Sequence, residues 1–276
     1  MISKITILPL KAFRFICDVI IFNIIFALLS ILSFRVPSKA IVGFSSNHLN
    51  GELRCIFDEL RDKEGVQAYF VTNLPEELER LNRSSIEAYY CRDILKISLF
   101  VNTRVWVTSH GPYYIPEYFF FRALKLRRSK WIDTWHGVGV EEGSGLGRAK
   151  MLCSYDMAFV PSEFYRRYYS SKQEGIMHKM RVTGSPRTDS LVNDSMDREE
   201  ISSNLKLDGE RRNILYAPSW GNPAAGEERT KSLFPFGDDF DLIDRLDAFC
   251  IECGYNFLTL TPIVQGIHLA ITTVHL

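Results

Sequence analysis

The sequence predicts an α/β protein built on a parallel sheet, and three observations support this fold class. From residue 39 onward, short apolar runs alternate with longer stretches of helical periodicity. Strands separated by helices of this length pair in parallel, with helices on both faces of the sheet. Hydrophobic residues make up 46% of the 276 residues and charged residues 24%, so the chain can form a folded core.

Composition and charge exclude several classes of protein. Lys plus Arg and Asp plus Glu both number 33, so no global positive field attracts nucleic acid, and we expect no nucleic-acid partner. The six cysteines are scattered, which is typical of a reduced chain rather than a disulfide framework. Cys250 and Cys253 form a C-x-x-C pair without a second pair nearby, so we interpret them as ordinary thiols.

The N-terminal segment, residues 1–35, is expected to associate with a membrane. Residues 13–34 are mostly apolar and carry basic residues on both sides, but Asp18 and Asn23 interrupt the run. A bilayer crossing needs about 20 apolar residues. Three alternatives stay open: the segment lies in the membrane interface, crosses the membrane once, or packs as a helix against the following domain.

The next region, residues 36–195, contains the elements of one complete Rossmann-like domain. We expect strands at 39–44, 66–71, 104–109, 130–135, 156–161 and 179–184. We expect helices at 49–63 and starting at Pro75, Ser162 and Pro186. Ligands of such sheets bind beyond the carboxyl ends of the strands, so the loops that follow the strands are the candidate site.

The last part of the chain is predicted to form a linker and a smaller second domain. Residues 196–212 are polar and charged, and we expect a linker helix there. A strand at 213–218, a helix at 238–254 and a strand at 255–260 follow. Residues 213–276 are fewer than the roughly 100–150 that a Rossmann-like domain needs, so we expect an incomplete domain that is poorly ordered or irregularly packed.

Four motifs follow predicted strands, and together they carry a family resemblance. They are TWHGVG at 134–139, FVPSEF at 159–164, TGSPRTDSL at 183–191 and LYAPSW at 215–220. In this order and spacing they resemble the CDP-glycerol glycerophosphotransferases of teichoic-acid-type polymer synthesis. The resemblance implies a GT-B-like architecture, in which residues 36–195 form the acceptor-side domain and residues 213–276 a truncated donor-side domain.

The resemblance also implies a reaction and a location. Glycerol phosphate passes from CDP-glycerol to a hydroxyl of a teichoic-acid-type polymer or its lipid-linked primer, and CMP is released. The implied place is the cytoplasmic face of the cell membrane, with peripheral or single-pass attachment. CDP-glycerol is then a substrate rather than a tightly bound cofactor, and the resemblance leaves a role for Mg²⁺ open.

By resemblance, His136 is the general base of this reaction. An alcohol is a poor nucleophile at neutral pH, and a base that titrates near neutrality can take its proton as it attacks phosphorus. Gly137 and Gly139 would let the chain turn tightly beside the substrate.

Three further residues are candidates for substrate binding: Arg187, Asp189 and Ser219. Arg187 could clamp a phosphate or pair with Asp189 or Asp194 to hold the turn, and both alternatives stay open. Ser219 stands where the family usually has Thr, so the hydroxyl is kept, either for the substrate or to cap the following turn.

The sequence departs from the family at two motifs, which raises two other hypotheses. The stretch Val140, Glu141 and Glu142 stands where the family commonly has a Lys, and carboxylates there repel a phosphate-rich substrate. Thr261 and Pro262 stand where the family usually has His-Pro. The chain could therefore be an inactive, truncated member that only binds the acceptor, or another GT-B enzyme that uses a nucleotide sugar.

Overall fold

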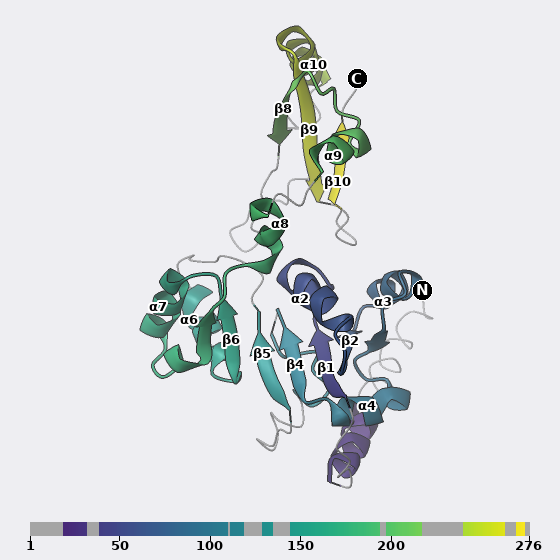
Figure 1. Cartoon of the computed structure of the whole chain (residues 1–276), viewed down its shortest axis with the longest axis vertical. Helices are drawn as coiled ribbons and strands as arrows, with labels where there is room; N and C mark the ends of the chain where they lie inside the picture. Colours follow the sequence, from purple (N-terminus) through teal and green to yellow (C-terminus); the bar gives the residue numbers. More distant parts are fainter. Residues whose placement is uncertain are drawn as a thin grey trace, which may run out of the picture. The chain divides into compact units, whose positions relative to one another are not determined.

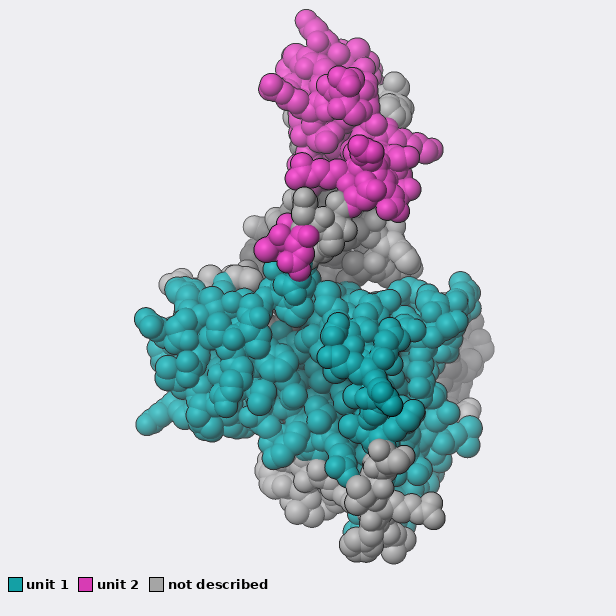
Figure 2. All heavy atoms as spheres, in the orientation of Figure 1, with its two compact units in different colours: residues 1–189 teal, residues 190–276 magenta. Residues whose placement is uncertain are grey.

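The computed structural model describes residues 19–31, 39–109, 111–118, 129–134, 144–193, 197–216, 240–262 and 269–273. The chain divides into two compact units, residues 1–189 and residues 190–276, which are coloured separately in Figure 2.

The first unit is built on a seven-stranded sheet in the order β3-β2-β1-β4-β5-β6-β7 (Figure 1). All neighbouring strands pair in parallel, which confirms the predicted α/β fold class. The strands are β1 (Ala40–Ser45), β2 (Val66–Thr72), β3 (Ala88–Tyr90), β4 (Val105–Thr108), β5 (Lys130–Asp133), β6 (Met157–Val160) and β7 (Met180–Val182).

The helices lie on both faces of the sheet because the strand order reverses at β1. The chain places β2 and β3 on one side of β1, and β4 to β7 on the other side. Right-handed crossovers then lie on opposite faces for the two directions. Leu53 of α2 (Gly51–Arg61) and Leu81 of α3 (Pro75–Arg83) bury against Phe44 and Phe70 on one face. The other face carries α4 (Ile97–Asn102), α6 (Ser144–Leu152) and α7 (Glu163–Lys172).

A large aromatic core fills the second face. Tyr69, Trp106, Trp131 and Tyr155 are fully buried there and meet edge to face at ring-centroid distances of 5.7 to 6.4 Å. Gly43 of β1 lies against Trp106, and a Cβ at this position would overlap the indole ring. The glycine therefore lets the largest side chain of the core reach the sheet.

The helix at 19–31 contacts this core with one face only. Phe22 and Phe26 are 1% and 2% exposed and belong to the aromatic core, so packing against the domain, one of the three alternatives, does occur. The opposite face leaves a row of aliphatic side chains exposed by 47–67%: Ile20, Ile21, Ile24, Leu28 and Ile31. Among the described helices, none combines the length and the apolar character needed to span a bilayer.

Short 3-10 helices connect the longer elements of this unit. They are η1 (Ile94–Lys96), η2 (Met177–Lys179) and η3 (Pro186–Thr188), and α8 (Asp189–Val192) continues directly from η3. The predicted helix start at Pro186 is confirmed, although its first turn is a 3-10 helix.

The second unit contains a three-stranded sheet in the order β10-β9-β8. β8 (Arg212–Tyr216) pairs in parallel with β9 (Tyr255–Pro262), and β10 (Leu269–Thr273) adds an antiparallel edge. α10 (Phe240–Cys253) connects β8 and β9 and ends before Gly254, whose φ of 68° suits glycine. Within the described residues of this unit, backbone pairing of the three strands satisfies their polar groups. The expectation that residues 213–276 form an incomplete domain stays a prediction.

The predicted helix across 197–212 is shorter than expected. α9 (Arg198–Asn204) starts at Asp197, whose carboxylate accepts hydrogen bonds from the Glu199 and Glu200 N–H groups at 2.9 and 3.0 Å. Lys206 has a φ of 53°, in the left-handed region, so the helix cannot continue through it. Polar composition predicted the helix start but not this stop.

Candidate active site

The predicted site residues divide into those that the structure describes and those that it does not. His136, Gly137, Gly139 and Ser219 lie outside the described residues, so their predicted roles stay predictions. Arg187 lies in η3, and Asp189 is the first residue of α8. The surroundings of the Trp-His-Gly segment are described on both sides of it.

A buried ion pair joins the described elements on either side of the segment that contains His136. Asp133 is the last residue of β5, and Arg148 lies on α6, the first element after the loop. Arg148 Nη2 donates to Asp133 Oδ2, and the two side chains are only 6% and 1% exposed. Burial lowers the pKa of the Arg148 guanidinium, and the charge of Asp133 opposes this effect.

Further hydrogen bonds fix the first residue of that loop. Thr134 donates from its backbone N–H and from its hydroxyl to the Thr108 carbonyl of β4, at 2.8 and 3.1 Å. The Thr108 hydroxyl in turn lies 2.6 Å from the hydroxyl of Tyr155. Burial raises the pKa of Tyr155 well above its ordinary value, so this phenol stays neutral. Thr134, which precedes the segment with His136, thus belongs to a buried, hydrogen-bonded polar layer.

This polar layer lies at the carboxyl ends of the strands. Its buried residues are Ser45, Ser46, Thr72, Thr108, Ser109, Asp133 and Thr134. These buried side chains carry hydroxyl or carboxylate groups, whereas most other buried side chains of the unit are apolar. Parallel sheets bind ligands at this edge.

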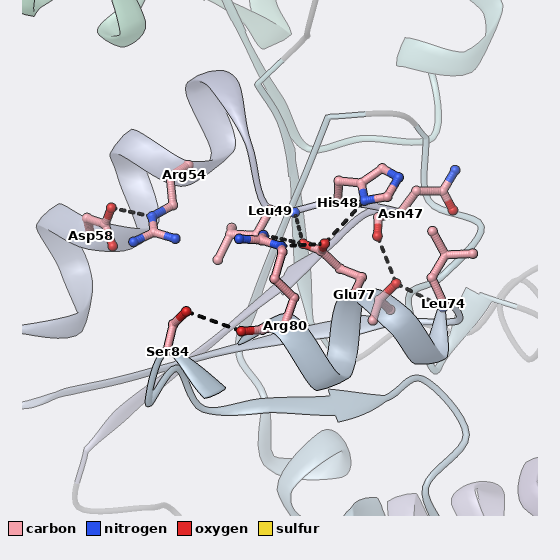
Figure 3. Close-up of polar contacts among 10 residues, drawn as sticks. Asn47, His48, Leu49, Arg54, Asp58, Leu74, Glu77, Arg80 and Ser84 are labelled. Carbon is pink, nitrogen blue, oxygen red and sulfur yellow. Dashed lines mark hydrogen bonds and ion pairs between the residues drawn. The ribbon is translucent and has the colours of Figure 1, made fainter. Parts of the chain in front are cut away.

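His48 lies at the same edge, in the loop between β1 and α2, and sequence reasoning did not select it. Its Nδ1 is 3.3 Å from Glu77 Oε2 (Figure 3). Arg80 donates to both oxygens of Glu77, from Nε at 2.9 Å and from Nη2 at 2.7 Å, and the Leu49 N–H donates at 2.9 Å. Because Glu77 only accepts when ionised, the Nδ1 of His48 is the donor in this contact.

The charge state of Glu77 follows from these bonds. Burial raises the pKa of Glu77, but the hydrogen bonds from Arg80, the Leu49 N–H and His48 outweigh burial, so the pKa lies below its ordinary value of 4.5. No spacing motif signals the cluster, since His48 and Glu77 lie on different connections of the sheet. His48 lies in the connection after the strand predicted at 39–44, and this position was the available signal.

Arg187 makes an ion pair that neither sequence alternative named. Its Nε lies 2.9 Å from Oε1 of Glu52, in the first turn of α2, and the Ser185 hydroxyl donates to the same oxygen at 2.7 Å. Gly184, with a φ of 79°, makes the turn that leads into this contact. Among the described residues Arg187 has no bond to Asp189, so pairing with Asp189 is not how the turn is held.

Asp189 is exposed and lines a mostly apolar cavity of about 520 Å³. The cavity lies between α2 and the sheet, and its walls include Ile132 of β5, Phe159 of β6 and Pro186 of η3. Burial and then the carboxylates of Glu52, Asp58 and Asp189 raise the pKa of the Cys55 thiol at this cavity, so the thiol stays protonated. Within the described part of the chain, no group of side chains is suited to hold a metal ion.

Comparison with solved structures identifies relatives of this fold. The wall teichoic acid polymerase TagF superposes with a TM-score of 0.60 at 20% sequence identity, covering 90% of this chain and 63% of that chain. A TagF variant soaked with CDPG gives a TM-score of 0.58 at 20% identity, with the same coverage. At this identity the likeness supports the α/β, GT-B-like fold.

Sequence comparison points in the same direction. A curated teichoic acid glycerol-phosphate transferase from Staphylococcus aureus (strain NCTC 8325 / PS 47) is 21% identical over 257 residues, which covers 83% of this chain. The chain spans 63% of the length of that relative. Residues 26–250 match the family described as CDP-Glycerol:Poly(glycerophosphate) glycerophosphotransferase, and this match covers most of the chain. The chain therefore belongs to the CDP-glycerol:poly(glycerophosphate) glycerophosphotransferase family.

Proposed function

We propose that this chain transfers glycerol phosphate from CDP-glycerol to a hydroxyl of a teichoic-acid-type polymer or its lipid-linked primer. The observation that carries the proposal is the buried Asp133–Arg148 pair. It holds together the two ends of the loop that carries the Trp-His-Gly motif, at the carboxyl edge of a parallel sheet. A rigid loop stem at this edge is suited to present a catalytic side chain.

The reaction is a displacement at phosphorus. His136 takes the proton of the acceptor hydroxyl as its oxygen bonds to the phosphorus that carries the glycerol. The bond from that phosphorus to the bridging oxygen breaks, and CMP leaves with the electron pair. Arg187 binds an acceptor phosphate through guanidinium hydrogen bonds. Gly137 and Gly139 allow close approach of the backbone, and the Ser219 hydroxyl bonds the donor. The scheme uses no tightly bound cofactor.

The release of CMP tests this proposal. Purified protein is incubated with CDP-glycerol and a poly(glycerol phosphate) primer, with and without EDTA to measure any need for Mg²⁺. We expect turnover by the parent protein and a loss of about 10²- to 10⁴-fold in the His136→Ala variant, because a general base contributes about this much. His178→Ala, at an exposed position of η2, is the matched control. Equal rates for the two variants would refute the role of His136.

A second candidate function, acceptor binding without transfer, is favoured by one observation. β9 ends with Thr261 and Pro262, and Thr261 pairs with Ala270 of β10. Threonine donates a hydrogen bond but brings no positive charge to a pyrophosphate, as the histidine expected there by resemblance would. Primer binding in a titration, with no CMP released, would support this candidate over the transferase.

We also propose that the helix at 19–31 attaches the protein to the cytoplasmic face of the membrane. Its exposed aliphatic row repeats every three to four residues, which places it on one face of the helix. Phe22 and Phe26 hold the opposite face against the core, so the exposed face can enter the lipid headgroup region. Basic residues that flank the helix in sequence, including Lys11 and Arg35, favour anionic headgroups.

Co-sedimentation with phosphatidylglycerol vesicles tests this attachment. Replacing both Ile24 and Leu28 by Gln is expected to weaken binding by about tenfold or more, because burial of each side chain is worth about 1.5–3 kcal/mol. Leu95→Gln, at a side chain that is 90% exposed on η1, is the matched control. Unchanged binding of the double variant would contradict a lipid contact through this face.

A further inference from the structure

Glu52 is a buried carboxylate with an unusual division of bonds between its two oxygens. Its side chain is 9% exposed. Oε1 accepts a hydrogen bond from the Ser185 hydroxyl at 2.7 Å and forms an ion pair with Nε of Arg187 at 2.9 Å. Oε2 is buried and has no hydrogen-bond partner among the residues that the structure describes. A buried acceptor without a donor costs about 1–3 kcal/mol. Arg–carboxylate pairs are frequently bidentate, with two parallel N–H···O bonds, whereas this contact involves one oxygen and one nitrogen.

The guanidinium of Arg187 is held by one edge only. The ion pair with Glu52 lies at Nε, and among the described residues no hydrogen bond from a terminal nitrogen of Arg187 is seen. The Arg187 side chain is 44% exposed. Two nitrogens that carry four N–H donors are therefore available, in the planar arrangement that suits a phosphate group.

The Glu52 contact also decides where Arg187 lies in the fold. The segment after β7 leaves the carboxyl edge of the sheet and reaches the first turn of α2, which follows β1. Pro186 lines the cavity with Ile132 of β5 and Phe159 of β6, so this segment lies over those strands. β5 is the strand that continues into the Trp-His-Gly segment.

We infer that Glu52 is a positioning residue, which acts through Arg187 to recognise a phosphate of the polyol-phosphate acceptor. The inference rests on the proposed transfer reaction for the identity of the acceptor. Glu52 fixes the Nε edge of the guanidinium, and Ser185 fixes Glu52. The terminal nitrogens of Arg187 then bind the phosphate next to the reacting hydroxyl. Arg187 binds the acceptor polymer rather than the CMP leaving group. Glu52 therefore affects the affinity for the acceptor more than it affects the rate of the chemical step.

Kinetics with a poly(glycerol phosphate) primer separate this role from a structural one. Glu52→Ala is expected to raise KM for the primer by about tenfold to a hundredfold, since a hydrogen bond to a charged group is worth about 1.5–3 kcal/mol. kcat is expected to change by less than about twofold. Glu52→Gln keeps an acceptor oxygen for Arg187 and Ser185, so it should restore most of the affinity. Ser185→Ala should raise KM by less than Glu52→Ala does.

A double-mutant cycle gives the sharpest outcome. Once Arg187 is Ala, the further change Glu52→Ala should leave the primer KM unchanged, because Glu52 acts through Arg187. Additive effects of the two changes would overturn the inference. Glu79→Gln removes an exposed carboxylate from α3, which does not line this cavity, and is the matched control. If Glu52→Ala fails to fold, Glu52→Gln and Ser185→Ala complete the comparison.

Failure of the inference can be told apart from failure of the proposed function. If the parent protein releases no CMP, the transferase proposal fails, and primer binding by isothermal titration still measures the coupling between Glu52 and Arg187. If the parent turns over but the Glu52 variants keep the parental KM, the transferase stands and the positioning role is refuted.

Discussion

The buried pair between Asp133 and Arg148 allows one stability prediction to be developed in full. Replacing Arg148 by Met keeps much of its aliphatic stem but leaves the Asp133 carboxylate without its cation. Both side chains are less than a tenth exposed, so solvent screens the loss very little. Breaking a buried ion pair by removing one partner costs about 3–5 kcal/mol. That is a large part of the roughly 5–15 kcal/mol that stabilises a typical domain.

The reverse expectation holds when both charges are removed together. Asp133→Leu combined with Arg148→Met leaves no unpaired charge, and such replacements are often neutral or stabilising. The double variant should therefore be more stable than Arg148→Met alone by about 3 kcal/mol or more. It should still transfer glycerol phosphate more slowly, because displacement of a catalytic group by about 1 Å can cost about a hundredfold.

Urea unfolding followed by tryptophan fluorescence measures these costs. Trp106 and Trp131 are buried in the first unit, and a Trp220→Phe background removes the tryptophan of the second unit from the signal. A loss below about 1 kcal/mol for Arg148→Met would place it in the range of an exposed pair. That result, or a double variant as unstable as the sum of the single ones, would refute the reasoning.

Three further predictions concern the core and the Glu77 carboxylate that contacts His48. Gly43→Ala should destabilise the first unit by about 1–3 kcal/mol in urea unfolding, because its Cβ overlaps Trp106; a neutral effect would contradict this packing. Phe26→Ala should cost about 3–5 kcal/mol in the same assay, because its ring is buried in the aromatic core; a cost near zero would show that the helix does not pack there. The pKa of Glu77 is lowered in the folded state, so its stabilisation is present above pH 4.5 and is lost as the pH falls through the folded value. Glu77→Gln should therefore remove this acid-dependent part of the unfolding free energy, and an unchanged pH profile would exclude the contribution of the carboxylate.

The alternation of apolar runs and helical patterns predicted most of the sheet. β1, β2, β4, β5, β6 and β7 occur where strands were expected. The three-residue strand β3 was missed, because its partner β2 and not its own periodicity makes it a strand. The second unit shows the same limit: β10 forms by pairing with β9, and the local sequence gives no independent signal for it.

Local sequence patterns predicted the motifs of the candidate site but not the long-range partners of its residues. The order of the motifs identified the family, and the strand-end rule identified the relevant edge of the sheet. The partners of the site residues are long-range contacts that spacing does not encode. Glu52 lies far from Arg187 in sequence, and Glu77 far from His48, so only the fold could bring each pair together.

Mass spectrometry of a lipid-linked primer, incubated with the protein and CDP-glycerol, tests the central claim most directly. The transferase proposal predicts primer products that are heavier by whole glycerol phosphate units, and it predicts that these products disappear with His136→Ala but persist with His178→Ala. A primer that binds the parent protein yet keeps its original mass, or that grows equally well with His136→Ala, would contradict the proposal.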